Sequence, residues 1–275
     1  MKSEELLEVL LQTVLPGGII LNSLRGTIEN SPKESDLPLG VADRTSTAHT
    51  IADDIVQEVA LSILHFQCPN VRLNAEEDTP RVKLFEHNRN DLCYHLDPLD
   101  GTLSYVEGKN GFAIGAAFSR NTEFVASAIY FPAINRVFTA TRGSGVSVQT
   151  GFGKTVPFNR RTPPGDLFLQ KRSEKLLPLV EELGLTSFDA QGAHHGMLAI
   201  AEGRAKVLMY RFASPHDFGI PQVIVEEAGG VCTDLKGNTI AYDSQFNRVP
   251  WFFAFSDQDV KDAFFEKLSD LGFHT

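Results

Sequence analysis

The segment HLDPLDGT, residues 95–102, contains the residues whose types and spacing most clearly suggest chemistry. An apolar run that ends at Leu96 leads directly into two aspartates three positions apart, Asp97 and Asp100. Carboxylates at the end of a buried strand can converge without being fully buried, and hard oxygen ligands of this kind suit Mg²⁺. The segment therefore predicts a metal site at the end of a strand.

The residues around these aspartates suit the same site. Pro98 fixes the backbone, so the Leu99 carbonyl could point the same way as the two carboxylates. Gly101 allows a ligand to approach the backbone closely, and the Thr102 hydroxyl could orient a water molecule. Two Mg²⁺ ions about 4 Å apart could stabilise both the attacking and the leaving oxygen of a phosphoryl transfer. Three further acidic residues stand at the ends of expected elements and could complete the set: Asp53, Glu76 and Asp217.

The elements of the first half must bring these residues together. Apolar residues at helical spacing predict helices over 4–15 and 50–66. Pro16-Gly17-Gly18 is expected to break or kink the first helix before a second helical piece over 19–25, and the polar residues 26–47 are expected to form a long loop. A largely antiparallel sheet is expected from strands at 71–73, 92–96, 111–118, 124–131 and 136–141.

The second half alternates between helical and strand patterns. Helices are expected at 173–183, 193–202, 218–228 and 257–271, and strands at 205–209, 231–234 and 250–255. These patterns indicate an N-terminal α+β lobe over residues 1–149, which carries most of the candidate metal ligands, and a C-terminal α/β lobe over residues 150–275. We expect the two lobes to share one core and to form one compact unit.

Composition and charge argue against several classes of protein. The chain has 275 residues, of which 42% are hydrophobic and 22% charged, as in ordinary globular proteins. A net charge of −10 argues against nucleic acid or an acidic membrane surface as the partner, but not against phosphates, because a bound cation can reverse the local sign. Three scattered cysteines fit a reducing cytoplasm. No signal peptide and no apolar run near the ~20 residues of a membrane span is recognised.

Several motifs together resemble those of the inositol monophosphatase family of magnesium-dependent, lithium-sensitive phosphatases. DPLDGT (97–102) is similar to the family's D-P-[IL]-D-G-[TS], and Glu76-Glu77 in NAEED lies upstream at the expected place. HDFGIPQVIVEEAGG (216–230) resembles the segment from W-D-x-A-A to E-A-G-G, and TIADD (50–54) resembles T-x-A-D at a helix start. YFPAINRVFTATRGSG (130–145) is similar to the family's strand-turn-strand. The motifs follow the family's order.

The resemblance implies a layered αβαβα sandwich and a magnesium-dependent phosphomonoesterase with two or three Mg²⁺ ions. It also implies that Mn²⁺ can substitute, that Li⁺ inhibits, and that the chain forms a homodimer. Thr102, paired with Asp53, would act with Glu76 to position and deprotonate the attacking water. The metal ligands that the resemblance implies are Glu76, Asp97, the Leu99 carbonyl, Asp100 and Asp217.

The same resemblance indicates where a substrate would bind. The backbone amides of Gly101 and Thr102 would hold the phosphate, and Gly192-Ala193 falls where the family's Gly-Ser/Thr-Ala segment meets the substrate. Three positions depart from the family: His216 replaces a Trp, Ser104 replaces an Asn, and Tyr210 stands where inositol phosphatases carry a substrate-contacting Glu. Metal binding is expected to survive these changes, whereas substrate choice is expected to be affected, with Tyr210 either at the substrate or in the core.

Simpler explanations stay open for single residues. Asp97 could form a turn with Pro98, Asp53 and Asp217 could cap helices, and Glu76 could be a solvated surface charge. The adjacent pair His194-His195 is expected at the surface of a helix start. The whole set predicts hydrolysis of a small sugar, inositol or nucleotide phosphate. A 3'(2'),5'-bisphosphate nucleotidase, a fructose-1,6-bisphosphatase and a non-catalytic protein that binds phosphate and metal remain as alternatives.

Overall fold

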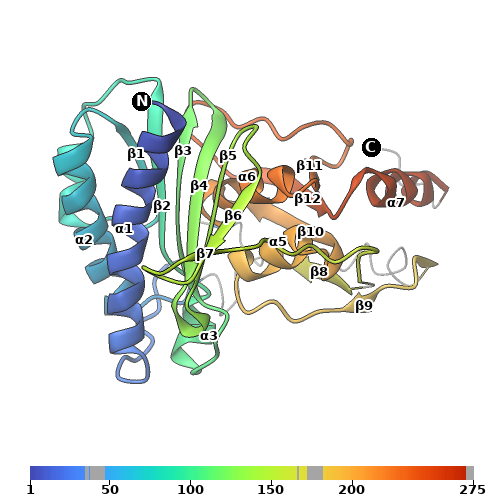
Figure 1. Cartoon of the computed structure of the whole chain (residues 1–275), viewed down its shortest axis with the longest axis horizontal. Helices are drawn as coiled ribbons and strands as arrows, with labels where there is room; N and C mark the ends of the chain where they lie inside the picture. The colour runs from blue at the N-terminus through green and yellow to red at the C-terminus, as the bar shows by residue number, and fades with distance from the viewer. Residues whose placement is uncertain (35–36, 38–46, 166, 172–181, 271–275) are drawn as a thin grey trace.

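The protein folds as five alternating layers of helices and sheets (Figure 1). This computed structural model describes residues 1–34, 37, 47–165, 167–171 and 182–270. Two helices cover one face of a seven-stranded sheet, two more separate it from a five-stranded sheet, and a last helix covers the far face of the second sheet. The αβαβα sandwich that the resemblance implies is confirmed. The helices, in layer order, are α1 (Ser3–Leu24), α2 (Ile51–Gln67), α5 (Ala193–Ala201), α6 (Ile220–Glu227) and α7 (Gln258–Asp270).

The first helix, α1, runs as one helix through Pro16, so a break at Pro16-Gly17-Gly18 is wrong, while a kink there stays a prediction. The two glycines instead let the helix lie close to the sheet. A Cβ on Gly17 would collide with Ile114, and one on Gly18 would collide with Tyr130. Burial against the sheet therefore outweighs the cost of proline inside the helix. By length and hydropathy α1 could also cross a membrane, but half of the relevant window is buried, as in a core helix.

The second helix, α2, begins one residue after the cap that the sequence pattern TIADD provides. The Thr50 side chain accepts a hydrogen bond from the Ala52 amide, and the Asp53 carboxylate accepts one from the Thr50 amide at 2.8 Å. This reciprocal capping satisfies amides that have no partner within a helix. It also fixes Asp53 in the first turn, with its side chain turned inward.

The first sheet has the order β1-β2-β3-β4-β5-β6-β7. β1 is parallel to β2, and every later neighbour is antiparallel, which confirms the expected antiparallel meander. β2 is longer than expected and includes both aspartates of DPLD, with a shift of register between Asp97 and Asp100. The strands are β1 (Arg72–Ala75), β2 (Leu92–Asp100), β3 (Ala113–Arg120), β4 (Glu123–Phe131), β5 (Arg136–Thr141), β6 (Val146–Gln149) and β7 (Thr155–Val156).

The second sheet has the order β11-β12-β10-β8-β9 and mixes parallel with antiparallel pairs. The strands and helices expected in this half are present, except that the helix at 173–183 falls mostly outside the described residues. The strands are β8 (Leu167–Lys171), β9 (Thr186–Ser187), β10 (Ala205–Ala213), β11 (Val231–Thr233) and β12 (Val249–Phe255). Short helical turns complete the fold: η1 (Pro80–Leu84), α3 (Thr102–Val106), η2 (Pro132–Ile134) and η4 (Pro215–Gly219).

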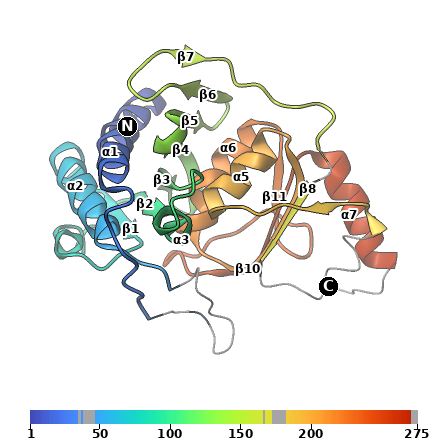
Figure 2. The ribbon, with the colours of Figure 1, turned by 90° about the horizontal axis from the view of Figure 1, so that it is seen from below.

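Apolar side chains fill the spaces between the layers. One cluster lies between α1, α2 and the first sheet, a second between that sheet and α5 and α6, and a third under α7. β7 joins the first sheet although it lies beyond residue 149, so this sheet extends past the boundary expected between the lobes. The division into lobes at 149 stays a prediction. In the view from below, α3 follows directly from the C-terminal end of β2 (Figure 2).

Candidate active site

The end of β2 places two carboxylates in the interior. Asp97 and Asp100 are only 1% and 4% exposed, and the whole strand is buried. Asp97 faces Gly115 of β3 across the sheet, and the irregular register after it lets the chain turn. The Asp97 carboxylate accepts a hydrogen bond from the Leu99 amide at 3.0 Å, which fixes the DPLD turn. The strand thus holds both acids rigidly at its C-terminal end.

The turn after β2 contacts the first turn of α2 through side chains. Gly101 has a φ of +77°, a left-handed conformation that glycine adopts at little cost. Thr102 follows, and its Oγ1 lies 2.9 Å from the Leu99 carbonyl oxygen and 3.3 Å from Asp53 Oδ1. Asp53 is held in turn by the Thr50 hydroxyl at 2.7 Å. The structure therefore brings Asp53, Leu99 and Thr102 together.

Burial of Asp53 has an electrostatic consequence. Its pKa is raised to about 7, chiefly because burial disfavours the charged form, and the hydrogen bonds from Thr50 offset this only in part. The negative charges of Glu76 and Glu77 add to the increase. A carboxyl group that titrates near neutral pH beside a hydroxyl group has the properties of a general base.

Glu76 lies just after β1, and its amide donates a hydrogen bond to the Leu96 carbonyl of β2 at 3.1 Å. Its carboxylate is partly exposed and pairs with the Lys33 ammonium at 3.2 Å. The same ammonium contacts Glu77. Burial would raise the pKa of Glu76, but the charges of Lys33 and His216 lower it overall. The site therefore contains a cation next to one of its carboxylates.

Asp217 reaches the site from the second half of the chain. It was expected at the N-cap of a helix, but it lies inside the turn η4, whose N-cap is Ser214. The Ser214 hydroxyl accepts a hydrogen bond from the Asp217 amide at 3.1 Å and donates one to its carboxylate at 3.0 Å. The helix α6 starts only at Ile220. Asp217 is thus held by the turn before the helix rather than by capping α6.

The start of α5 is bound to the end of β2. The Ala193 amide donates to Asp100 Oδ1 at 2.7 Å, and the His194 amide donates to Oδ2 at 3.0 Å. A Cβ on Gly192 would collide with the same carboxylate, so only glycine allows this approach. Ala193 therefore helps to hold Asp100 in place and Gly192 leaves room for it, while their contact with a substrate stays a prediction.

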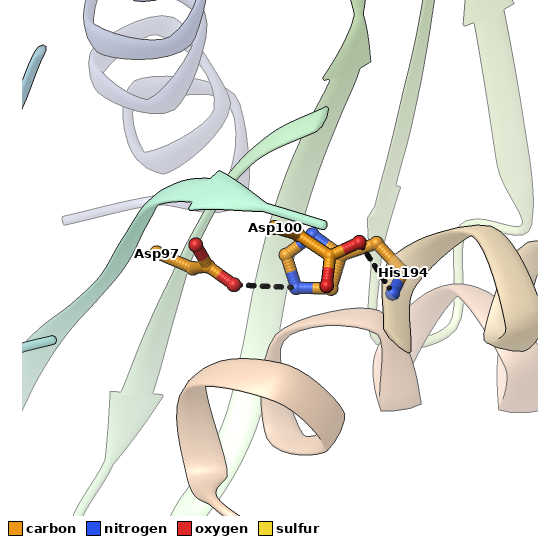
Figure 3. A group of neighbouring side chains, drawn as sticks. All are labelled: Asp97, Asp100 and His194. Carbon is orange, nitrogen blue, oxygen red and sulfur yellow. Dashed lines mark hydrogen bonds and ion pairs between the residues drawn. The ribbon is translucent and has the colours of Figure 1, made fainter. Parts of the chain in front are cut away.

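His194 was expected at the surface, and this is wrong because its side chain is fully buried. Its ring nitrogen Nε2 lies 3.1 Å from the His216 carbonyl oxygen. The same nitrogen lies 3.7 Å from Asp97 Oδ2 (Figure 3). Next to it, His195 is half-buried and packs edge-on against Phe188. Burial, together with the charge of Arg204, lowers the pKa of His195 to about 4.

The carboxylates are crowded enough to resist ionisation. Burial raises the pKa of Asp97 well above its usual value, and the charges of Glu76, Asp100 and Asp217 raise it further. Burial also raises the pKa of Asp100, with an added contribution from Asp217. Ligand atoms of Asp97, Asp100 and His194 lie within 4.8 Å of one another. Buried carboxylates repel one another and offer hard oxygen ligands, so this cluster is suited to bind a divalent cation.

A cavity of about 260 Å³ opens beside these acids. Tyr210 lies on its wall, half-buried, with its ring centroid 4.4 Å from that of Phe218. Two basic side chains, Lys109 and Arg248, also line the cavity. Asp53 is the one expected site residue that does not line the cavity, and it contacts the lining residue Thr102. The other expected site residues all line it: Glu76, Asp97, Leu99, Asp100, Gly101, Thr102, Gly192, Ala193, Tyr210 and Asp217.

Sequence reasoning missed Lys33 and misplaced His194. Lys33 lies in a polar segment without periodicity, and nothing in that pattern places it beside Glu76. His194 begins an otherwise apolar helix, AHHGMLAIA, and a histidine on the buried face of such a helix is the only signal that could have placed it inside.

Comparison with known proteins gives a consistent result. A sequence model of the inositol monophosphatase family matches residues 3–252. The histidinol-phosphatase of Chlorobaculum parvum is 27% identical over 208 residues, which are 74% of this chain and 78% of that protein. The 3'(2'),5'-bisphosphate nucleotidase CysQ of Salmonella typhimurium is 26% identical over 220 residues, 78% of this chain and 83% of that one. An IMPase structure from Thermotoga maritima shares the fold, with a TM-score of 0.72 at 21% identity over 94% of this chain and 96% of that chain.

Proposed function

The chain belongs to the inositol monophosphatase family, a family of phosphoric monoester hydrolases, and we propose that it hydrolyses a small phosphorylated metabolite with the help of Mg²⁺. The observation that carries this proposal is the convergence of Glu76, Asp97, Asp100 and Asp217 on one cavity. These acids come from three separate parts of the sequence. A cation site requires its carboxylates to lie together, whereas residues that only cap helices or form turns would have no reason to converge.

The residues present fit a divalent cation. Asp97 and Asp100 are buried together with raised pKa values, so the cluster is electrostatically unfavourable by itself. Glu76 attracts the Lys33 ammonium, which indicates that this place favours positive charge. We infer that Glu76, Asp97, the Leu99 carbonyl, Asp100 and Asp217 would hold the ions. When bound, Mg²⁺ ions would supply the positive charge that stabilises the transition state and favours deprotonation of water.

The chain's own residues would then position the reactants. Thr102 would orient the attacking water through its hydroxyl, which Asp53 holds, and Glu76 would act with this pair in accepting the proton. The amides of Gly101 and Thr102 would hold the phosphate. Water would add to phosphorus from the side opposite the ester oxygen as the P–O ester bond breaks. The proton accepted from the water would return to the leaving ester oxygen, so that the alcohol and inorganic phosphate leave.

The substrate end of the cavity indicates which esters could fit. Tyr210 presents a half-buried aromatic ring, and Lys109 and Arg248 add positive charge to the lining. We propose that Tyr210, Gly192 and Ala193 contact the organic part of the substrate. An aromatic wall with basic residues nearby is compatible with a nucleotide or sugar bisphosphate as well as with an inositol phosphate.

Further properties follow only from the family. We propose that two or three Mg²⁺ ions bind, that Mn²⁺ can replace them, and that Li⁺ inhibits. We also propose that the chain forms a homodimer in the cytoplasm and binds neither nucleic acid nor membranes. The second function that stays open is binding of phosphate and metal without turnover. The complete ligand set argues against it, because a site that had lost its activity would not need to keep every carboxylate and Thr102.

The test is phosphate release from a panel of esters, measured with Mg²⁺ and with EDTA. The panel holds inositol 1-phosphate, fructose 1,6-bisphosphate, 3'-phosphoadenosine 5'-phosphate, histidinol phosphate and glycerol 2-phosphate. Release that needs Mg²⁺ would support the reaction, and the preferred ester would identify the substrate class. A folded protein that binds Mg²⁺ but releases phosphate from none of them would favour the binding function instead.

A further inference from the structure

His194 occupies a space that the neighbouring strand leaves for it. The side chain begins α5, is fully buried, and points towards the end of β2 (Figure 3). Across from it, β3 carries Gly115, and a Cβ at that position would collide with the imidazole ring. A glycine in the middle of a strand weakens the strand, so its presence indicates that something must approach closely. Here the approaching group is the ring of His194.

The hydrogen on this ring can be assigned from its neighbours. Nε2 faces two acceptors, the His216 carbonyl oxygen at 3.1 Å and Asp97 Oδ2 at 3.7 Å. A carbonyl oxygen can only accept, so Nε2 must carry a hydrogen. Nδ1 is buried and has no partner among the described residues. The ring therefore donates from Nε2, and no Nε2 lone pair is available to ligate an ion.

Through these contacts His194 links the acidic residues at the end of β2 to the turn η4. The backbone amide of His194 holds Asp100, its ring faces Asp97, and its Nε2–H holds the carbonyl of His216, the residue before Asp217. We propose that His194 is a positioning residue that fixes the turn carrying Asp217 against Asp97 and Asp100, and so preorganises the carboxylates for a divalent cation. This inference rests on the proposed function, because it assumes that the cluster binds Mg²⁺.

The decisive variants differ only in where they place a side-chain N–H. Gln at position 194 can put its amide near the place of Nε2, whereas Asn stops near the place of Nδ1. We expect His194→Gln to bind Mg²⁺ nearly as well as the wild type in calorimetric titration. His194→Asn should bind about 10- to 100-fold more weakly, the usual effect of losing a group that orients metal ligands. The measured quantity is the Kd for Mg²⁺, which does not depend on turnover.

Met197→Ala provides the matched control. Met197 is also fully buried and lies one turn further along α5, in the apolar core. Its truncation should lower the melting temperature and leave the Kd for Mg²⁺ unchanged. An equal loss of affinity in this variant would mean that any damage to α5 weakens binding, and the specific role of His194 would be rejected.

The other outcomes separate the two proposals. If the wild type itself does not bind Mg²⁺, the proposed metal site fails. If the wild type binds and His194→Asn binds equally well, only the positioning role fails. Nitrogen NMR of the wild-type imidazole decides the question should the Asn variant not fold. The inference requires a protonated Nε2 whose signal shifts during a Mg²⁺ titration, and an Nε2 without a hydrogen or an unmoved signal would overturn it.

Discussion

At the residue scale, the acids at the end of β2 have opposite effects on stability and on function. Asp97 is buried beside other negative charges, so it destabilises the metal-free fold, while its carboxylate oxygens are what a cation would bind. The sequence made this residue identifiable because DPLDGT is compact and specific. The positions of His194 and Lys33 could not be predicted, since both depend on contacts between segments far apart in the chain.

Replacing Asp97 with Asn should separate these two effects. Asp97→Asn removes one negative charge from the cluster but keeps the size of the side chain. We expect turnover with Mg²⁺ to fall by at least about 100-fold, and the melting temperature in EDTA to stay the same or rise. Asp91→Asn is the control, because Asp91 is half-exposed and precedes the same strand. Normal turnover in Asp97→Asn would remove this residue from the site.

Asp53 should make the stability of the metal-free protein depend on pH. Its pKa is raised from the usual 3.8 to about 7 by burial, so between these values the folded protein holds a proton that the unfolded chain has lost. Stability in EDTA should therefore be greatest at low pH and fall as pH rises from about 4 to about 7, by at most ~4 kcal/mol for this group. The melting temperature should depend less on pH across this range in Asp53→Asn than in the wild type. An equal pH dependence of the melting temperature in the two proteins would contradict the assignment.

At the element scale, the strands and helices that carry the site follow from local patterns, with two instructive exceptions. α1 passes through Pro16 because Gly17 and Gly18 allow it to pack closely on β3 and β4, a tertiary gain that local propensity cannot reveal. The strands β6, β7 and β9 are two to four residues long, too short for a period of two to be recognised. Short elements are defined by their neighbours and not by their own residues.

The turn from β2 into α3 gives a prediction for this scale. Gly101 combines a φ of +77° with a Gln191 carbonyl oxygen 2.5 Å from where a Cβ would lie. Gly101→Ala should therefore lower the free energy of unfolding by ~1–3 kcal/mol and also weaken Mg²⁺ binding, because the turn must move. Gly108→Ala is the matched control, with a φ of +75° and no neighbour within 4 Å of the added Cβ. It should show the backbone strain alone, with normal Mg²⁺ affinity.

At the scale of the whole molecule, the layered arrangement brings residues from both halves of the chain to one place. α5 lies between the two sheets (Figure 1), and both its first residues and η4 contact β2. The sequence supported this arrangement by the order of its motifs and by alternation of elements in the second half. It could not specify how closely the halves approach, because that depends on glycines such as Gly115 and Gly192, whose space is filled from the opposite layer.

Cation binding should consequently stabilise the molecule as a whole. Asp217 comes from the second half, while Asp97 and Asp100 come from the first, so an ion held by all three would join the two halves. At 100 times its Kd, Mg²⁺ would add about 2.7 kcal/mol, which for a chain of this size corresponds to a rise in melting temperature on the order of 5–10 °C. Asp217→Asn should lose most of this rise. Asp259→Asn, an exposed change in the first turn of α7, should keep it. A melting temperature of the wild type that does not respond to Mg²⁺ would contradict a cation that bridges the two halves, and an equal response in both variants would show that the ion binds without Asp217.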